Sequence, residues 1–241
     1  MNPLSGLWQF IQNPYNDYSG HTQTFFALCL VALFWALIIA IPLGILSAQN
    51  RSLAFVATNI SGLGRAIPTI AFFGFAVSTP WLGIGFKPAV ISLIVLGIPP
   101  ILLNTIAGLQ SIDPAVVDAA RGMGMTRLQS LLRVQLPLVL PVIAAGVRTS
   151  AVQIVATAPL AAIIGAGGYG DYILGGIGLI SLIGPAEALA GVIPVIALAL
   201  ITEYGLAALQ RALTPKALRR QNARELRQTS ASADGKGVVA A

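Results

Sequence analysis

Few side chains in this 241-residue chain have the chemistry for catalysis or for metal binding. There is one histidine, His21, and one cysteine, Cys29, which lies inside an apolar run and is expected to be a packing residue. A nucleophile needs a base beside it and a metal site needs several ligands, so one histidine supports neither. The phosphate-binding pattern G-x-x-x-x-G-K-[ST] does not occur in the sequence. We therefore predict no catalytic residue, no metal site and no cofactor.

Charged side chains inside apolar runs are the second unusual feature. Arg65, Arg148 and Glu203 each interrupt a long apolar stretch. A charge in the middle of a membrane-spanning helix costs roughly 2.5–3.5 kcal/mol on insertion scales, so each of these residues needs a partner or water. Two interpretations remain open. The three side chains line a solute path or couple helix movement, or Arg148 and Glu203 form an intramembrane ion pair that holds helices together.

The composition predicts an integral membrane protein. Hydrophobic residues make up 56% of the chain and charged residues 9%, and the mean hydropathy is +0.83. Soluble domains usually contain about 25% charged residues. The net charge of +6 is compatible with nucleic-acid binding. However, the basic residues gather at the ends of apolar runs and in the C-terminal tail, which favours membrane topology and no nucleic-acid partner.

Apolar runs long enough to cross a bilayer, about 20 residues each, predict an all-α protein with about five transmembrane helices. The second run contains Pro68 and is expected to be kinked or broken there. A sixth, short element is possible in residues 172–183. The five predicted spans lie within residues 25–47, 53–77, 88–109, 138–164 and 186–209.

Positively charged residues predict the orientation in the plasma membrane. With five spans, most of the basic residues fall on one side, which the positive-inside rule places in the cytoplasm. They are Arg51, Arg121, Arg127, Arg133, Arg211, Lys216, Arg219, Arg220, Arg224 and Arg227. We therefore expect residues 1–24 to be extracytoplasmic, residues 25–213 to form the transmembrane domain, and residues 214–241 to be a basic, partly disordered cytoplasmic tail.

The long polar connection between the third and fourth spans, residues 111–137, carries strong local signals. Asp113 followed by Pro114 is typical of a helix start. Gly122 and Gly124 are expected to break this helix after Arg121, and Thr126 with Gln129 three residues later predicts a capping box that begins a second one.

We expect Pro137 to end this second helix and to start the next span. The pattern predicts a helix–glycine turn–helix that faces the cytoplasm and fits the groove of a partner protein. The alternative is an amphipathic loop that lies on the membrane surface.

The same loop resembles the E-A-A-x-x-x-G-x9-I-x-L-P signature of binding-protein-dependent ABC importer permeases. Aspartate replaces glutamate and valine replaces isoleucine. The matching residues are Asp118, Ala119, Ala120, Gly124, Val134, Leu136 and Pro137. The resemblance implies the MetI-like permease fold, with this loop docking on a separate ABC ATPase subunit. It also implies an extracytoplasmic solute-binding protein and a second permease subunit, identical or paralogous, within the membrane lipid.

Further stretches resemble the osmoprotectant branch of these permeases. They are Arg65–Thr69 (RAIPT), Gly146–Thr149 (GVRT) and Gly165–Asp171 (GAGGYGD). The resemblance implies import of glycine betaine, choline, carnitine or a proline-type solute. It also implies that Gly165, Gly167 and Gly168 belong to an outer gate or to a contact with the binding protein, although a simple outer loop is equally compatible. An amino-acid permease, such as one for methionine, and a secondary transporter are the alternatives.

Overall fold

The protein is a bundle of long helices. A computed structural model describes residues 3–178 and 184–213, and no strand occurs within these ranges. The elements are α1 (Pro3–Gln12), η1 (Pro14–Asn16), α2 (Tyr18–Ala48), α3 (Arg51–Ala66), α4 (Thr69–Val77), α5 (Phe86–Gln110), α6 (Pro114–Gly122), α7 (Arg127–Ser130), η2 (Leu131–Gln135), α8 (Leu136–Thr157), η3 (Ala158–Ile164), α9 (Tyr169–Gly178) and α10 (Gly184–Leu213).

Four stretches are long and apolar enough to cross a membrane, and a bent helix pair makes a fifth. The four are Pro14–Ala48, Phe86–Gln110, Arg127–Ile164 and Pro185–Ala212. The pair consists of α3 and α4, which are bent by 91° relative to each other. The prediction of an all-α membrane protein with about five spans is confirmed.

The break between α3 and α4 lies where the sequence predicts it. Helix α3 ends at Ala66, Ile67 is extended with φ −76° and ψ 126°, and α4 begins after Pro68. Proline has no N–H for the helix ladder and disfavours the helical conformation of the residue before it. The short element expected in residues 172–183 corresponds in part to α9, and residues 179–183 lie outside the described ranges.

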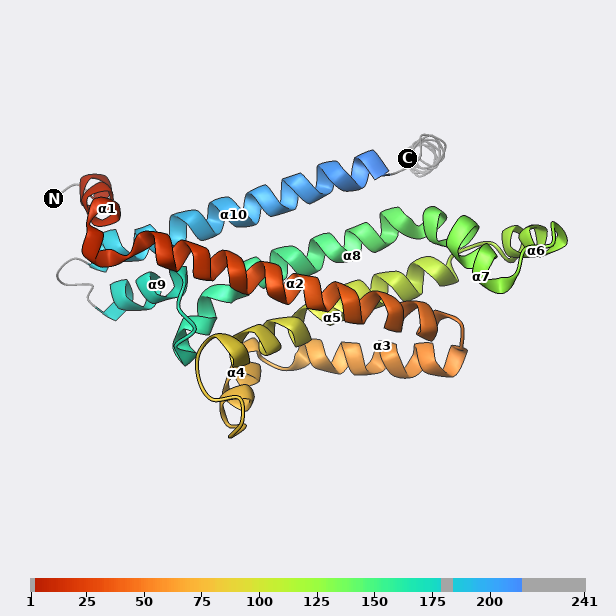
Figure 1. Cartoon of the computed structure of the whole chain (residues 1–241), viewed down its shortest axis with the longest axis horizontal. Helices are drawn as coiled ribbons and strands as arrows, with labels where there is room; N and C mark the ends of the chain where they lie inside the picture. Colours follow the sequence, from red (N-terminus) through yellow and green to blue (C-terminus); the bar gives the residue numbers. More distant parts are fainter. Residues whose placement is uncertain (1–2, 179–183, 214–241) are drawn as a thin grey trace, which may run out of the picture.

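The long helices lie side by side and give the molecule two ends (Figure 1). We call the end that carries α6 and α7 the loop end, and the end that carries α1 and α9 the opposite end. Helix α5 packs between α2 and α8, and α10 lies beside α8 and α9. The span of α5 is the most buried of the four unbroken spans and that of α10 is the least buried.

The helices of the core approach closely because glycine faces the neighbouring helix at each crossing. A Cβ atom on Gly44 of α2 would lie 2.7 Å from the Cβ of Thr105 on α5. A Cβ on Gly146 of α8 would lie 2.7 Å from the Cβ of Asn104 and 2.8 Å from the carbonyl oxygen of Pro100, both on α5. Small residues at such crossings allow the backbone contact that stabilises helix pairs in lipid.

One predicted boundary is wrong. The second loop helix does not end at Pro137, because α7, η2 and α8 follow one another from Arg127 to Thr157 without an intervening loop. A π-helical turn, η2, directly precedes α8 and opens the backbone there, so the chain stays helical through the proline. The loop is therefore joined to a span without an intervening coil.

Replacement of Gly146 by alanine tests the close crossing of α5 and α8. We expect Gly146→Ala to destabilise the folded protein by about 1–3 kcal/mol, because the new methyl group overlaps α5. The thermal unfolding midpoint in detergent measures this effect. Gly62→Ala on α3 is the matched control, since a Cβ there meets nothing within 4 Å. Equal midpoints for the two variants would contradict the crossing.

Candidate functional site

The loop between α5 and α8 is two short helices joined by a glycine turn. The Asp113 side chain accepts a hydrogen bond of 2.9 Å from the N–H of Ala115, which caps α6. Gly124 has a φ of +81°, a conformation that strongly favours glycine. The N–H of Gln129 donates to the Thr126 hydroxyl, and the Gln129 side chain accepts from the N–H of Thr126, which closes the capping box at α7. The predicted helix–turn–helix is confirmed.

The signature residues of this loop differ in exposure. Asp118, Ala119 and Gly124 are exposed, and Asp118 pairs with Arg121 at 3.7 Å on the loop surface. Ala120 is buried, with 1% of its surface exposed. Val134 and Leu136 are half-buried where the loop enters α8, and Pro137 is exposed. The buried alanine therefore anchors α6, while the turn stays free for a partner.

Apolar and basic side chains surround the turn. Met123 is 70% exposed and Leu128 is 63% exposed. Large apolar side chains that lie together on a surface often mark a site of interaction with another protein. A polar cavity of about 540 Å³ lies between this loop and the end of α2, and its lining includes Gln49, Arg121 and Arg127. Exposed apolar residues next to charged ones are typical of a surface that binds another protein.

Arg148 and Glu203 are brought together by α8 and α10. The Nε of Arg148 lies 3.7 Å from the Oε1 of Glu203, and the side chains are 32% and 41% exposed. The Gln210 side chain donates a hydrogen bond of 3.1 Å to the carbonyl oxygen of Pro141, which is a further link between the two helices. Arg65 lies in the last turn of α3, and its side chain lies outside the described part of the structure.

Thr149 follows Arg148 directly on α8 and is exposed, and we call Arg148, Thr149 and Glu203 the polar face. Between Phe25 and Ser47, by contrast, every exposed residue of α2 is apolar. The bundle therefore has an apolar side suited to lipid and a polar face that is not.

At the opposite end, the glycine-rich segment closes against α2. Gly165, Gly167 and Gly168 have φ values of +72°, +80° and +84°, which fold the chain between η3 and α9. The Nδ1 of His21 lies 3.1 Å from the carbonyl oxygen of Gly168 and 3.4 Å from Oδ2 of Asp171. Because a carbonyl oxygen only accepts, Nδ1 carries the proton in this contact.

Aromatic contacts strengthen this closure. The ring of Tyr172 lies 4.6 Å from the ring of His21, and its hydroxyl donates to the carbonyl oxygen of Asn16. The Tyr169 hydroxyl donates to Thr22 at 3.1 Å. Burial raises the pKa of the Asp171 carboxyl, and the nearby His21 opposes this rise. The sequence does not indicate these contacts of His21, because Gly168, Asp171 and Tyr172 lie far along the chain from it.

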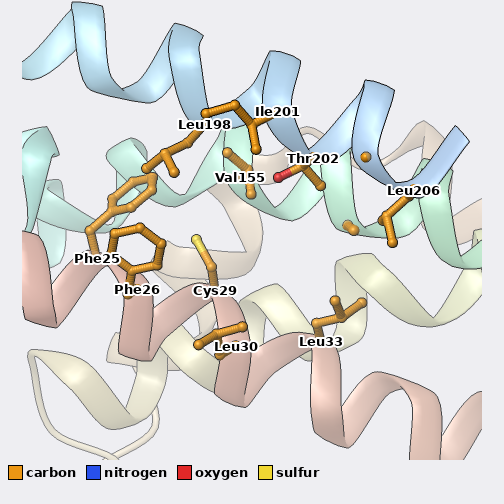
Figure 2. A pocket seen from close by; sticks show the side chains of 12 residues that line it. Phe25, Phe26, Cys29, Leu30, Leu33, Val155, Leu198, Ile201, Thr202 and Leu206 are labelled. Carbon is orange, nitrogen blue, oxygen red and sulfur yellow. The ribbon is translucent and has the colours of Figure 1, made fainter. Parts of the chain in front are cut away.

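An apolar crevice of about 310 Å³ lies between α2, α8 and α10 (Figure 2). Its wall includes Phe25, Cys29, Val155 and Leu198, and Thr202 is one of the few polar groups near it. No charged side chain lines it, so this crevice offers nothing that would hold a polar solute. Cys29 is a free, buried thiol in this wall.

Most of the chain matches a known protein family. The family model described as "Binding-protein-dependent transport system inner membrane component" matches residues 40–215. The chain belongs to this family. Members of the family are membrane components of ABC transporters, so the prediction that the chain is a permease and not an enzyme is confirmed. The family also confirms an inner-membrane, multi-pass protein.

The alignments of this permease with its relatives extend over nearly the whole length of each relative. The carnitine transport permease protein OpuCB of Listeria monocytogenes is 38% identical over 216 residues, which cover 90% of this chain and 97% of the relative. The choline transport system permease protein OpuBB of Bacillus subtilis is 34% identical over 212 residues, covering 88% and 95%. The osmoprotectant import permease protein OsmW of Salmonella typhimurium is 39% identical over 201 residues, covering 81% and 92%.

A solved structure shares the fold of this permease. The inward-facing MetNI methionine ABC transporter matches with a TM-score of 0.70 and 22% identity, covering 80% of this chain and 94% of the other. The predicted MetI-like permease fold is confirmed.

A charge swap tests whether Arg148 and Glu203 stabilise each other. Arg148→Glu or Glu203→Arg alone places two like charges together at membrane depth, and we expect a loss of about 2.5–3.5 kcal/mol and a low yield of folded permease. The double variant R148E/E203R restores opposite charges and should recover the yield in size-exclusion chromatography. A double variant that is as poor as the two single variants would contradict direct pairing.

Proposed function

We propose that this chain is the membrane-spanning permease subunit of an ABC importer that carries an osmoprotectant, such as glycine betaine, choline, carnitine or proline, across the plasma membrane. The observation that carries the proposal is the helix–glycine turn–helix between α5 and α8, with its exposed apolar and basic surface. The relatives named as carnitine, choline and osmoprotectant permeases support this solute class. The methionine alternative has weaker support, because the likeness to MetNI concerns the fold alone.

In this proposal the loop end faces the cytoplasm and the N-terminus lies outside. Arg51, Arg121, Arg127 and Arg211 all lie at or near the loop end, whereas Asp171 lies at the opposite end. This charge distribution supports the orientation through the positive-inside rule. A separate ABC ATPase docks on the loop that carries the coupling residues Asp118, Ala119, Ala120, Gly124, Val134, Leu136 and Pro137, and it contacts the exposed members and their exposed neighbours.

The direct connection between loop and span supports a mechanical role for the loop. Since α7, η2 and α8 follow one another without a coil, movement of α7 by the ATPase is passed to α8. Helix α8 carries Arg148 and contacts both α5 and α10. ATP-driven movement of the loop therefore reaches the polar face, which is the wall of the proposed solute path.

The opposite end receives the solute-binding protein in this proposal. Gly165, Gly167 and Gly168 form the segment held by His21, and this segment acts as the outer gate. Its polar contacts join α2 to α9, so movement of the segment would require the His21 contacts and the packing of Tyr169 and Tyr172 to change.

A substitution at the glycine turn tests the coupling role. We expect Gly124→Val to abolish uptake of radiolabelled glycine betaine and co-purification of the ATPase, because valine does not tolerate a φ of +81°. Membrane insertion should be unchanged. Gly122→Val, in the last turn of α6 and equally free of contacts, is the matched control and should retain most uptake. Normal uptake of glycine betaine by the Gly124→Val variant would contradict a role of this turn in coupling.

A growth and competition assay tests the solute class. A deletion strain that carries this chain should gain growth in high salt when glycine betaine is supplied. Unlabelled glycine betaine should compete with labelled solute, and methionine should not. Competition by methionine alone would support the amino-acid alternative.

The second permease subunit, identical or paralogous, covers the polar face in this proposal, because charged side chains at membrane depth face protein or water and not lipid. We expect Thr149→Cys, in a Cys29→Ala background without other cysteines, to form a bismaleimide-linked dimer of permease subunits. Phe34→Cys on the apolar side of α2, where residue 34 is 57% exposed, should not do so. A dimer from Phe34→Cys and none from Thr149→Cys would place the partner elsewhere.

A further inference from the structure

The Arg148–Glu203 pair lies well inside the membrane-spanning region. Arg148 is near the middle of α8, and Glu203 is nine residues before the end of the span Pro185–Ala212, or about 13 Å along the helix axis. Both side chains are about one-third exposed or more, and neither is packed into the core. Because a half-exposed charge at this depth is not compatible with lipid, the pair faces the solute path of the proposed importer.

The pair is loose in the described structure. Its single contact of 3.7 Å is longer than the 2.7–2.9 Å of a charge-assisted hydrogen bond. The guanidinium of Arg148 has five N–H donors, and no other contact of Arg148 or Glu203 occurs within residues 3–178 and 184–213. Each group therefore has capacity for a further partner of opposite charge.

The two charges offer different partners. Glu203 on α10 offers an anionic partner for a cation, and Arg148 on α8 offers a cationic partner for a carboxylate.

We propose that Arg148 and Glu203 form a transient binding point for zwitterionic solutes, an inference that rests on the proposed import function. The carboxylate of the solute accepts hydrogen bonds from Arg148, and its cationic nitrogen lies against Glu203. A zwitterion supplies both missing partners when it separates the pair. A simple cation such as choline leaves Arg148 without an anion. After the solute leaves, the two side chains compensate each other again, which keeps binding weak enough for release.

The test uses the whole transporter, with its ATPase and binding protein, in liposomes. Uptake of glycine betaine, a zwitterion, and choline, a cation, is measured at saturating binding protein. We expect Arg148→Gln to lower glycine betaine uptake by about tenfold or more and choline uptake by less than about twofold, as the loss of one charge-assisted contact implies. Glu203→Gln should lower uptake of both solutes. Arg211→Gln, an exposed arginine in the last turn of α10, is the matched control and should leave both rates unchanged.

The ATPase activity stimulated by loaded binding protein separates recognition from structure. Retained stimulation in Arg148→Gln, with selective loss of glycine betaine uptake, supports the binding point. Equal loss of both solutes and of stimulation indicates a structural pair and overturns the inference. An unchanged rate of glycine betaine uptake in Arg148→Gln also overturns the inference. A wild-type transporter that imports choline but no zwitterion overturns it as well. A wild type that imports neither solute refutes the proposed function itself.

Discussion

The absence of water from the bilayer core is the constraint on which this structure depends. Backbone and charged groups at that depth must find partners within the protein, since each unsatisfied group costs several kcal/mol. Long helices satisfy their own backbone, and the described spans meet this requirement except at the bent pair of α3 and α4. The same constraint makes Arg148 and Glu203 informative, because two charges at membrane depth require each other, water or a ligand.

Close helix crossings hold the core of this bundle together. Gly44 and Gly146 allow α2, α5 and α8 to approach one another closely. The loop of α6 and α7 continues into α8 through η2, without an intervening coil. At the opposite end, the segment held by His21 is fastened by polar contacts and by the buried rings of Tyr169 and Tyr172.

The family is identified from the sequence, whereas the details of the site are inferred from the structure. The loop signature and the family model agree on an ABC permease. The apolar crevice between α2, α8 and α10 is lined by no charged side chain, whereas the Arg148–Glu203 pair offers a positive and a negative group. The pair is therefore better suited than the crevice to contact a polar solute.

The membrane class, the number of spans, the break at Pro68 and the helix–turn–helix of the loop can all be predicted from the residues alone. These features depend on local properties: the length of apolar runs, the missing N–H of proline, the capping box of Thr126 and Gln129, and the freedom of Gly124. The folded chain was needed to show that Arg148 meets Glu203, that His21 holds the glycine-rich segment and that the helix continues through Pro137. The first two contacts join residues far apart in sequence, and the third depends on a π turn, so no local pattern specifies them.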